Sequence, residues 1–159
     1  MIELLLNDEG ETLALARALA GALAPGDLIA LEGGLGAGKT TFARGAIHGL
    51  AVPTETAVTS PTFALLHQYQ GRLPIVHADF YRLADDAEIE ELGVDELLEE
   101  GSVLFVEWGR KFLWVETRAS LWVDLEIVSD DVRRVRLLPQ GARGDALIAA
   151  VRTRLFAAC

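Results

Sequence analysis

The feature of this sequence that most constrains its fold is a glycine-rich segment that ends in lysine and threonine. Residues 33–40 read Gly-Gly-Leu-Gly-Ala-Gly-Lys-Thr and fit the phosphate-binding loop pattern G-x-x-x-x-G-K-[ST]. Glycines in such a loop allow positive φ and bring successive backbone N–H groups close to phosphate oxygens. The pattern predicts that Lys39 reaches the β- and γ-phosphates of a nucleotide and that the Thr40 hydroxyl binds Mg²⁺.

The segments on both sides of this loop favour a nucleotide site over a flexible turn. Residues 27–32 form a short apolar run after the turn signal Pro25-Gly26, which predicts a buried strand. Residues 41–50 carry apolar side chains at helical spacing, so strand, loop and helix follow in the required order. The predicted nucleotide-binding residues of the loop are Gly33, Gly34, Leu35, Gly36, Ala37, Gly38, Lys39, Thr40 and Thr41.

Length and composition predict one cytoplasmic domain over residues 1–159. Hydrophobic residues make up 51% of the 159 residues, which is enough for a proper core. No apolar run approaches the roughly 20 residues of a membrane span, and Leu4-Leu5-Leu6 is too short for a signal peptide. The single cysteine, Cys159, can form no internal disulfide, and a thiol-rich metal site is excluded.

The formal net charge of −10 argues against a direct electrostatic grip on nucleic acid, which requires a cationic surface. Acidic residues concentrate in residues 85–100, which hold nine acids and no base. This segment is either a solvated surface or a docking site for a charged protein partner.

Strand and helix patterns alternate along the rest of the chain. The predicted elements are a strand at 2–6, a helix from the capping box Asp8-x-x-Glu11 to about 23, a hairpin of 64–69 and 72–77, a helix at 86–100 broken at Gly93, a strand at 103–106, a hairpin of 121–128 and 132–138, and a helix at 145–156. This order predicts an α/β fold of the P-loop NTPase-like, three-layer kind with a mixed, partly antiparallel sheet. The loop should lie at the carboxyl end of a central strand.

Two acidic residues follow apolar strands and are the predicted catalytic residues. Asp79 ends the run 74–79, and Glu107 ends the run 103–107. A phosphoryl-transfer site needs an acid for the metal and a group that orients the nucleophile. Glu107 follows the more apolar strand and is also the predicted metal-linked acid, but spacing alone does not divide the two roles.

Two hydroxyl side chains and a tryptophan are further candidates. Ser60 and Thr62 lie in an extended segment, where they either reach Mg²⁺ or the γ-phosphate or form a local turn. Trp108 directly follows Glu107 and either stacks on a base or covers the core. The residue pattern leaves the choice for the two hydroxyls open and favours the core for Trp108 unless the site lies nearby.

Other charged and titratable residues have weaker patterns. The histidines show no metal-ligand spacing, so His77 is predicted to be structural, although it shares one face of a strand with Asp79. Arg44, Arg82 and Arg110 are candidates for stabilising charge on a transferred phosphoryl group, but none has a motif behind it. A partner protein would otherwise supply that charge.

Four segments together resemble the TsaE family of small bacterial P-loop ATPases, which act in threonylcarbamoyladenosine modification of tRNA. They are residues 33–45, Ser60-Pro61-Thr62-Phe63, His77-Ala78-Asp79-Phe80-Tyr81-Arg82-Leu83 and Glu107-Trp108, and the resemblance covers about residues 10–125. It implies ATP and Mg²⁺ as ligands, with phosphates on Lys39 and the metal on Thr40.

The resemblance also implies roles for residues outside the loop. Thr62 and Trp108 are expected beside the nucleotide, Asp79 as a switch acid and Glu107 as a catalytic or metal-linked acid. The implied partner is a threonylcarbamoyltransferase complex of TsaD and TsaB type proteins, which itself handles the tRNA. One residue departs from the family pattern, because Gly34 stands where the family usually has Asp, and any hydrogen bond of that side chain is lost.

Two other functions use the same loop. A small-molecule kinase would require an acceptor pocket and usually an arginine-rich lid, and no compact arginine-rich insertion follows the loop. A nucleotide-dependent binding module would assemble with partners without useful turnover. The absence of an Asn-Lys-x-Asp guanine signature favours ATP over GTP.

Overall fold

The computed structural model describes residues 1–157, so Cys159 lies outside the described residues. It contains a seven-stranded sheet in the order β1-β7-β6-β2-β5-β4-β3. The strands are β1 (Ile2–Leu6), β2 (Leu28–Gly33), β3 (Leu66–Gln70), β4 (Pro74–Asp79), β5 (Val103–Glu107), β6 (Leu121–Ile127) and β7 (Arg133–Pro139). The helices are α1 (Glu9–Ala20), α2 (Lys39–Gly49), α3 (Asp86–Glu91), α4 (Val94–Glu99), α5 (Leu113–Arg118) and α6 (Gly141–Phe156).

The sheet is mixed, as predicted, and its middle strands are parallel. β2 pairs in parallel with both β5 and β6, and β4 pairs in parallel with β5. The pairs β1–β7, β6–β7 and β3–β4 are antiparallel. The carboxyl ends of β2, β4 and β5 therefore meet at one edge of the sheet, where ligands bind in open α/β folds. The glycine-rich loop follows β2, the middle strand, which confirms that prediction.

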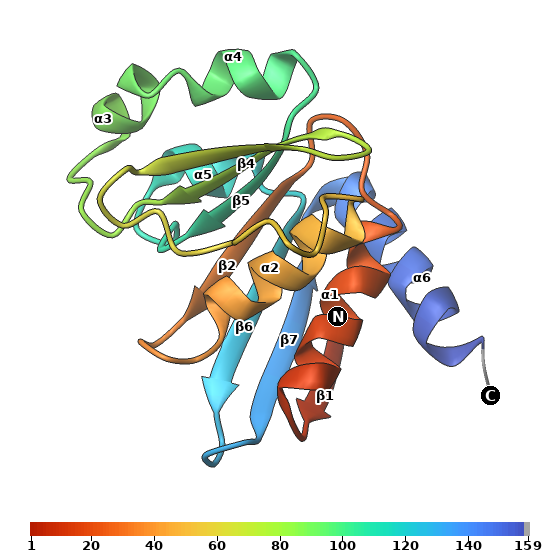
Figure 1. The fold of residues 1–159 in the computed structure, drawn as a ribbon. Helices are drawn as coiled ribbons and strands as arrows, with labels where there is room; N and C mark the ends of the chain where they lie inside the picture. The colour runs from red at the N-terminus through yellow and green to blue at the C-terminus, as the bar shows by residue number, and fades with distance from the viewer. Residues whose placement is uncertain (158–159) are drawn as a thin grey trace.

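Helices cover both faces of the sheet, which explains the continuous apolar runs in its central strands. In β2, Ile29 and Leu31 pack in the same cluster as Phe42 of α2 and residues of α1 and α6. Leu28 and Ala30 point to the opposite face and pack with side chains of α3, α4 and α5. Figure 1 shows α1 and α2 in front of the sheet and α5 behind β4 and β5. The three-layer prediction is confirmed.

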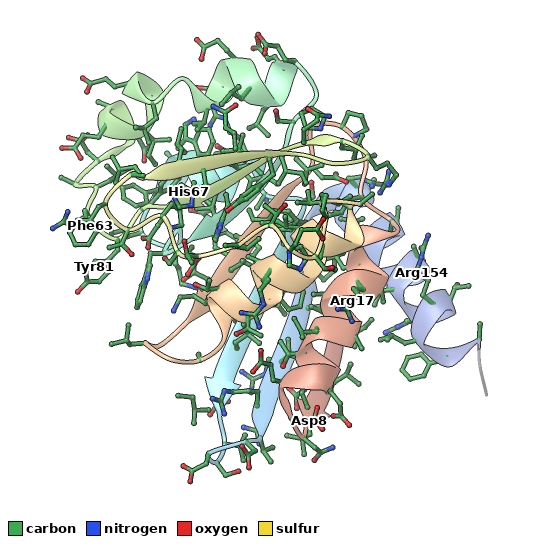
Figure 2. The ribbon with its side chains drawn as sticks, viewed as in Figure 1. Asp8, Arg17, Phe63, His67, Tyr81 and Arg154 are labelled. Carbon is green, nitrogen blue, oxygen red and sulfur yellow. The ribbon has the colours of Figure 1, made fainter. Side chains whose placement is uncertain are left out.

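The capping box predicted at the start of α1 is present. The Asp8 side chain, at the start of α1 in Figure 2, accepts a hydrogen bond from the Glu11 amide at 2.8 Å. The Glu11 carboxylate accepts one from the Asn7 amide at 2.7 Å. The helix ends at Ala20 rather than near residue 23, because the chain turns there towards β2.

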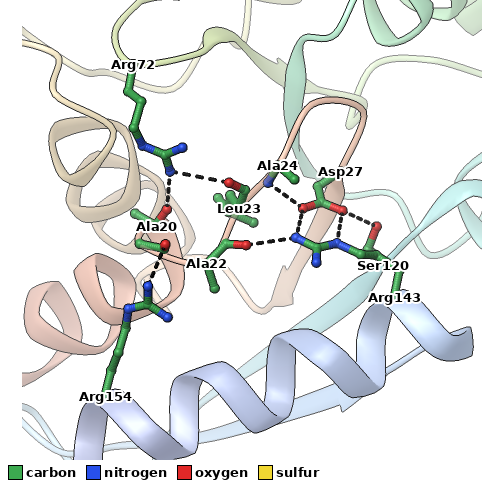
Figure 3. A network of polar contacts seen from close by, with 10 residues as sticks. Ala20, Ala22, Leu23, Ala24, Asp27, Arg72, Ser120, Arg143 and Arg154 are labelled. Atoms are coloured by element: carbon green, nitrogen blue, oxygen red, sulfur yellow. Dashed lines mark hydrogen bonds and ion pairs between the residues drawn. The ribbon is translucent and has the colours of Figure 1, made fainter.

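Three arginines from distant elements hold that turn together (Figure 3). Arg72, Arg143 and Arg154 donate hydrogen bonds to backbone carbonyls of residues 20–23. Arg143 also binds both carboxylate oxygens of the buried Asp27, at 2.8 and 2.7 Å. Cations at a helix C-terminus oppose the negative end of its dipole. Arg143 and Arg154 are thus structural residues.

Several element boundaries differ from the predictions. The break of the acidic helix at Gly93 is confirmed by separate helices α3 and α4, with Gly93 at a φ of 76°. α5 was not predicted, because six residues are too few to reveal a helical period. α6 begins at Gly141 rather than at 145. Its first turn was not predicted because glycine has a low helix propensity. Gly144 is required there: a Cβ would lie 2.4 Å from the carbonyl oxygen of Ser120.

No helix within residues 1–157 is long and apolar enough to cross a bilayer.

Candidate functional site

The glycine-rich loop curls between the end of β2 and the start of α2. Gly36 and Gly38 have φ values of 78° and 109°, a region that L side chains rarely adopt. No atom lies within 4 Å of a Cβ built on either residue, so backbone conformation rather than packing requires glycine there. α2 begins at Lys39, two residues earlier than predicted, and directs its positive N-terminal end at the loop. This geometry suits an anion.

A cavity of about 560 Å³ opens beside the loop. Its lining joins the loop and the first turn of α2 to three other segments: Leu35, Gly36, Gly38, Lys39, Thr40, Thr41, Ser60, Thr62, Asp79, Tyr81, Glu107 and Trp108. Most of the predicted site residues therefore come together. Gly33, Gly34 and Ala37 do not line this cavity: Ala37 is buried, and the two glycines contribute backbone carbonyls.

The Lys39 side chain folds back onto the loop. Its ammonium donates hydrogen bonds to the carbonyls of Gly33 at 2.7 Å and Gly34 at 2.9 Å. It also lies 4.1 Å from the centroid of the Trp108 ring, a cation–π contact. Burial lowers the pKa of Lys39 below its ordinary value, although Glu107 opposes this shift. A phosphate anion in the loop would favour the charged form of Lys39.

Thr40 and Glu107 form the part of the site that suits a divalent cation. The Thr40 hydroxyl lies 3.1 and 3.2 Å from the two carboxylate oxygens of Glu107. Mg²⁺ prefers oxygen ligands and is usually held by one or two carboxylates, waters and substrate phosphates. No group of three or more His, Cys, Asp or Glu residues forms a metal cage within residues 1–157. The donors present therefore fit Mg²⁺ that is bound together with a nucleotide.

Asp79 connects the extended segment before β3 to the end of β4. One Asp79 oxygen accepts hydrogen bonds from the hydroxyls of Ser60 at 3.0 Å and Thr62 at 3.3 Å. Its other oxygen accepts one from the Tyr81 amide at 2.9 Å. In the parallel register Asp79 stands opposite Glu107. The sequence left the role of Ser60 and Thr62 open. In the structure their hydroxyls face Asp79 at the cavity.

His77 lies at the site, although the sequence predicted a structural role for it. Its Nε2 donates a hydrogen bond to Glu107 Oε2 at 2.6 Å, and the residue is fully buried. Nδ1 has no hydrogen-bond partner among the described residues. His77 therefore orients Glu107. Its place on the same strand face as Asp79 suggested Asp79 as its partner instead. Only the β4–β5 pairing brings His77 and Glu107 together.

Trp108 forms a wall of the cavity instead of a cap on the core. Its ring centroid lies 5.1 Å from that of Tyr81, and Lys39 lies over its face. Its φ of 63° is exceptional for a bulky residue. Trp114, by contrast, is buried in the core and packs against Phe80.

The three candidate arginines lie outside the lining of this cavity. Arg44 pairs with Glu9, and Arg110 pairs with Asp124. Arg82 lies over the ring of the exposed Phe63, 4.6 Å from its centroid. Their side chains therefore make surface contacts in this structure.

Sequence reasoning missed one buried acid close to the loop. Glu32, the residue before Gly33, is 8% exposed and accepts a hydrogen bond from the Gly109 amide at 2.9 Å. Burial raises the pKa of Glu32 above its ordinary value, against the opposing effect of nearby Arg110. The sequence signal that could have identified Glu32 is its place as an acid at the end of a strand predicted to be buried.

A glycine-rich loop between a central strand and a helix, with acids at the ends of neighbouring parallel strands, defines a P-loop NTPase-like protein. Residues 6–135 match the family described as threonylcarbamoyl adenosine biosynthesis protein TsaE. The chain belongs to the TsaE family, as its motifs indicated.

Curated relatives and a solved structure agree with this membership. The tRNA threonylcarbamoyladenosine biosynthesis protein TsaE of Bacillus subtilis is 38% identical over 138 residues, covering 86% of this chain and 85% of the relative. The protein of the same name from Streptomyces coelicolor is 43% identical over 137 residues, covering 81% and 90%. The crystal structure of Bacillus subtilis YdiB superposes with a TM-score of 0.79 at 30% identity, covering 96% of this chain and 95% of YdiB.

Proposed function

We propose that this protein binds ATP with Mg²⁺ beside the glycine-rich loop and hydrolyses it in the service of tRNA threonylcarbamoyladenosine biosynthesis. The observation that carries the proposal is the convergence of Lys39, Thr40, Asp79 and Glu107 on one cavity of about 560 Å³. The names of the curated relatives support the pathway.

The loop and α2 would hold the triphosphate. Backbone amides of residues 34–38 and the N-terminus of α2 supply fixed positive potential. Lys39 would leave the carbonyls of Gly33 and Gly34 and bind the β- and γ-phosphates instead. Anion binding thus exchanges two hydrogen bonds from the ammonium to neutral carbonyls for contacts in which both partners are charged, which are stronger.

Thr40 and Glu107 would hold Mg²⁺, which neutralises charge on the phosphate oxygens when it is bound. His77 keeps the Glu107 carboxylate turned towards Thr40. Asp79 holds Ser60 and Thr62 at the cavity, so the segment 57–63 would close over the γ-phosphate and place the attacking water. We therefore assign Glu107 to the metal side and Asp79 to the side of the nucleophile.

The acidic surface bears on how the protein would meet tRNA. With a net charge of −10, this chain makes a poor electrostatic partner for RNA. A threonylcarbamoyltransferase complex of TsaD and TsaB type proteins would bind the tRNA, while ATP turnover here would drive or reset that complex. The acidic helices α3 and α4 are exposed enough to face such a partner.

The test is phosphate release from ATP with no acceptor present, measured with and without the reconstituted partner complex, alongside tRNA modification. Hydrolysis that rises with the partners supports the proposal. A phosphorylated small molecule would identify a kinase instead, and assembly without turnover would identify a binding module. Glu107→Gln should retain ATP binding and lose most of the hydrolysis, whereas Glu126→Gln, an exposed acid on β6, should retain both.

A further inference from the structure

We propose that Glu32 is a positioning residue, which holds the segment after β5 so that the Trp108 indole forms one wall of the nucleotide cavity. The inference deepens the function proposed above and rests on it for its effect on ATP. Glu32 itself does not line that cavity, and no step of the proposed hydrolysis uses it.

The first part of the argument is the backbone of Trp108. A φ of 63° is unfavourable for a bulky residue and persists only where neighbouring contacts impose it. Hydrogen bonds impose it from both sides. The Glu107 carbonyl accepts one from the Phe80 amide at 3.0 Å, and the Gly109 amide donates one to Glu32 at 2.9 Å. The first bond belongs to the backbone, so Glu32 is the side chain that controls this turn.

The second part is the confinement of Glu32. Glu32 is buried and extends from β2 towards the face covered by α5. It lines two further cavities, and Trp108 and Arg110 line both of them as well. Replacing its carboxylate by an apolar group would leave the buried Gly109 amide without an acceptor. Rotation about the N–Cα and Cα–C bonds of Trp108 would relieve both that loss and the unfavourable φ.

Such a rotation would move the indole away from Lys39 and Tyr81, which it now contacts. The cavity would lose one wall beside the phosphate-binding lysine. Glu32 thus couples the strand that begins the loop to the segment that carries Glu107. The sequence places these segments 77 residues apart, and the side-chain bond joins them directly.

The test compares Glu32→Met, which keeps the side-chain length and removes the acceptor, with Glu32→Gln, which keeps an acceptor oxygen. The readouts are the Trp108 emission of the nucleotide-free protein, corrected with Trp108→Phe, and the Kd for a non-hydrolysable ATP analogue. We expect Glu32→Met to shift the emission to longer wavelength and weaken analogue binding about tenfold, the scale of one lost buried hydrogen bond. Glu32→Gln should stay within about twofold of the wild type in Kd.

A double-mutant cycle separates positioning from general destabilisation. In a Trp108→Ala background, Glu32→Met should weaken analogue binding by less than about twofold further, because the wall is already gone. Additive losses, or an unchanged Trp108 emission in Glu32→Met, would overturn the inference. Glu126→Ala, which removes an exposed acid from one of the cavities that Glu32 touches, is the matched control and should alter neither readout.

Two provisions keep the result interpretable. If Glu32→Met does not fold, the shorter Glu32→Ala removes the same acceptor and takes its place in every comparison. If the wild type binds no nucleotide, the proposed function fails, but the emission of the nucleotide-free variants still decides whether Glu32 positions Trp108.

Discussion

The Thr40 hydroxyl contacts both carboxylate oxygens of Glu107, although 67 positions separate the two residues. Thr40 lies in the first turn of α2, and Glu107 ends β5, the strand beside β2. The sequence pointed to Thr40 through the loop motif and to Glu107 only through its place at a strand end. The fold brings these two side chains into contact. The contact joins phosphate binding to the acidic half of the site.

Lys39→Ala should abolish ATP binding, because the phosphates lose their cationic partner and the loop loses its two lysine hydrogen bonds. Isothermal titration with an ATP analogue measures the effect. Lys111→Ala removes the chain's other lysine and should leave the affinity unchanged. Micromolar affinity retained by Lys39→Ala would refute the assignment of the loop.

His77→Leu should lower the rate of ATP hydrolysis about tenfold while the KM for ATP changes little, because Glu107 loses the donor that orients it. His77→Gln keeps a donor of similar reach and should recover much of the rate. Steady-state kinetics on both variants decide the matter. The control is His67→Gln on the paired strand β3, which should behave as the wild type. Equal losses in the Leu and Gln variants would argue for packing alone.

Gly36→Ala should lower the stability of the protein, and Gly34→Ala should not. Gly34 has open space around it and an ordinary φ, so alanine should be neutral or stabilise by about 0.4–1 kcal/mol through a less flexible unfolded chain. Gly36 has a φ of 78°, where alanine costs about 1–2 kcal/mol. Urea unfolding of the two variants gives the difference. A destabilised Gly34→Ala would mean that the position needs glycine in its own right.

Glu32→Gln should change how stability depends on pH. Burial raises the pKa of Glu32 above its ordinary 4.5, so the folded protein binds this proton more tightly than the unfolded chain. The stabilisation by the neutral acid is present below pH 4.5 and is lost as pH rises through the folded pKa. Above that window Glu32→Gln should therefore gain in melting temperature relative to the wild type. A gain that does not vary with pH would contradict this reason.

Arg143→Ala should lower the free energy of unfolding by about 1–3 kcal/mol, because the buried Asp27 loses a bidentate partner. The guanidinium is 41% exposed, so solvent screening keeps the loss below that of a fully buried pair. Arg134→Ala breaks an exposed pair with Glu126 and should scarcely move the melting temperature. Equal effects in the two variants would remove the special role of Asp27.

Local rules were enough to predict the loop and most of the fold. Positive φ at glycine and a helix that follows the loop are properties of a few consecutive residues, so the sequence predicted both, although α2 begins two residues earlier than expected. Apolar runs such as 103–106 already indicate strands buried on both faces. The sheet, the hairpins and the break at Gly93 followed from the same kind of pattern.

Strand order and register lie outside such patterns, because they depend on which segments pair across the sheet. The sequence by itself determined that a glycine-rich loop joins a strand to a helix and which acids end strands. Only the tertiary structure brought Glu107 to Thr40, His77 to Glu107 and the Glu32 carboxylate to the Gly109 amide. The physical reason is that these contacts require the parallel alignment of β2, β4 and β5, which no single segment encodes.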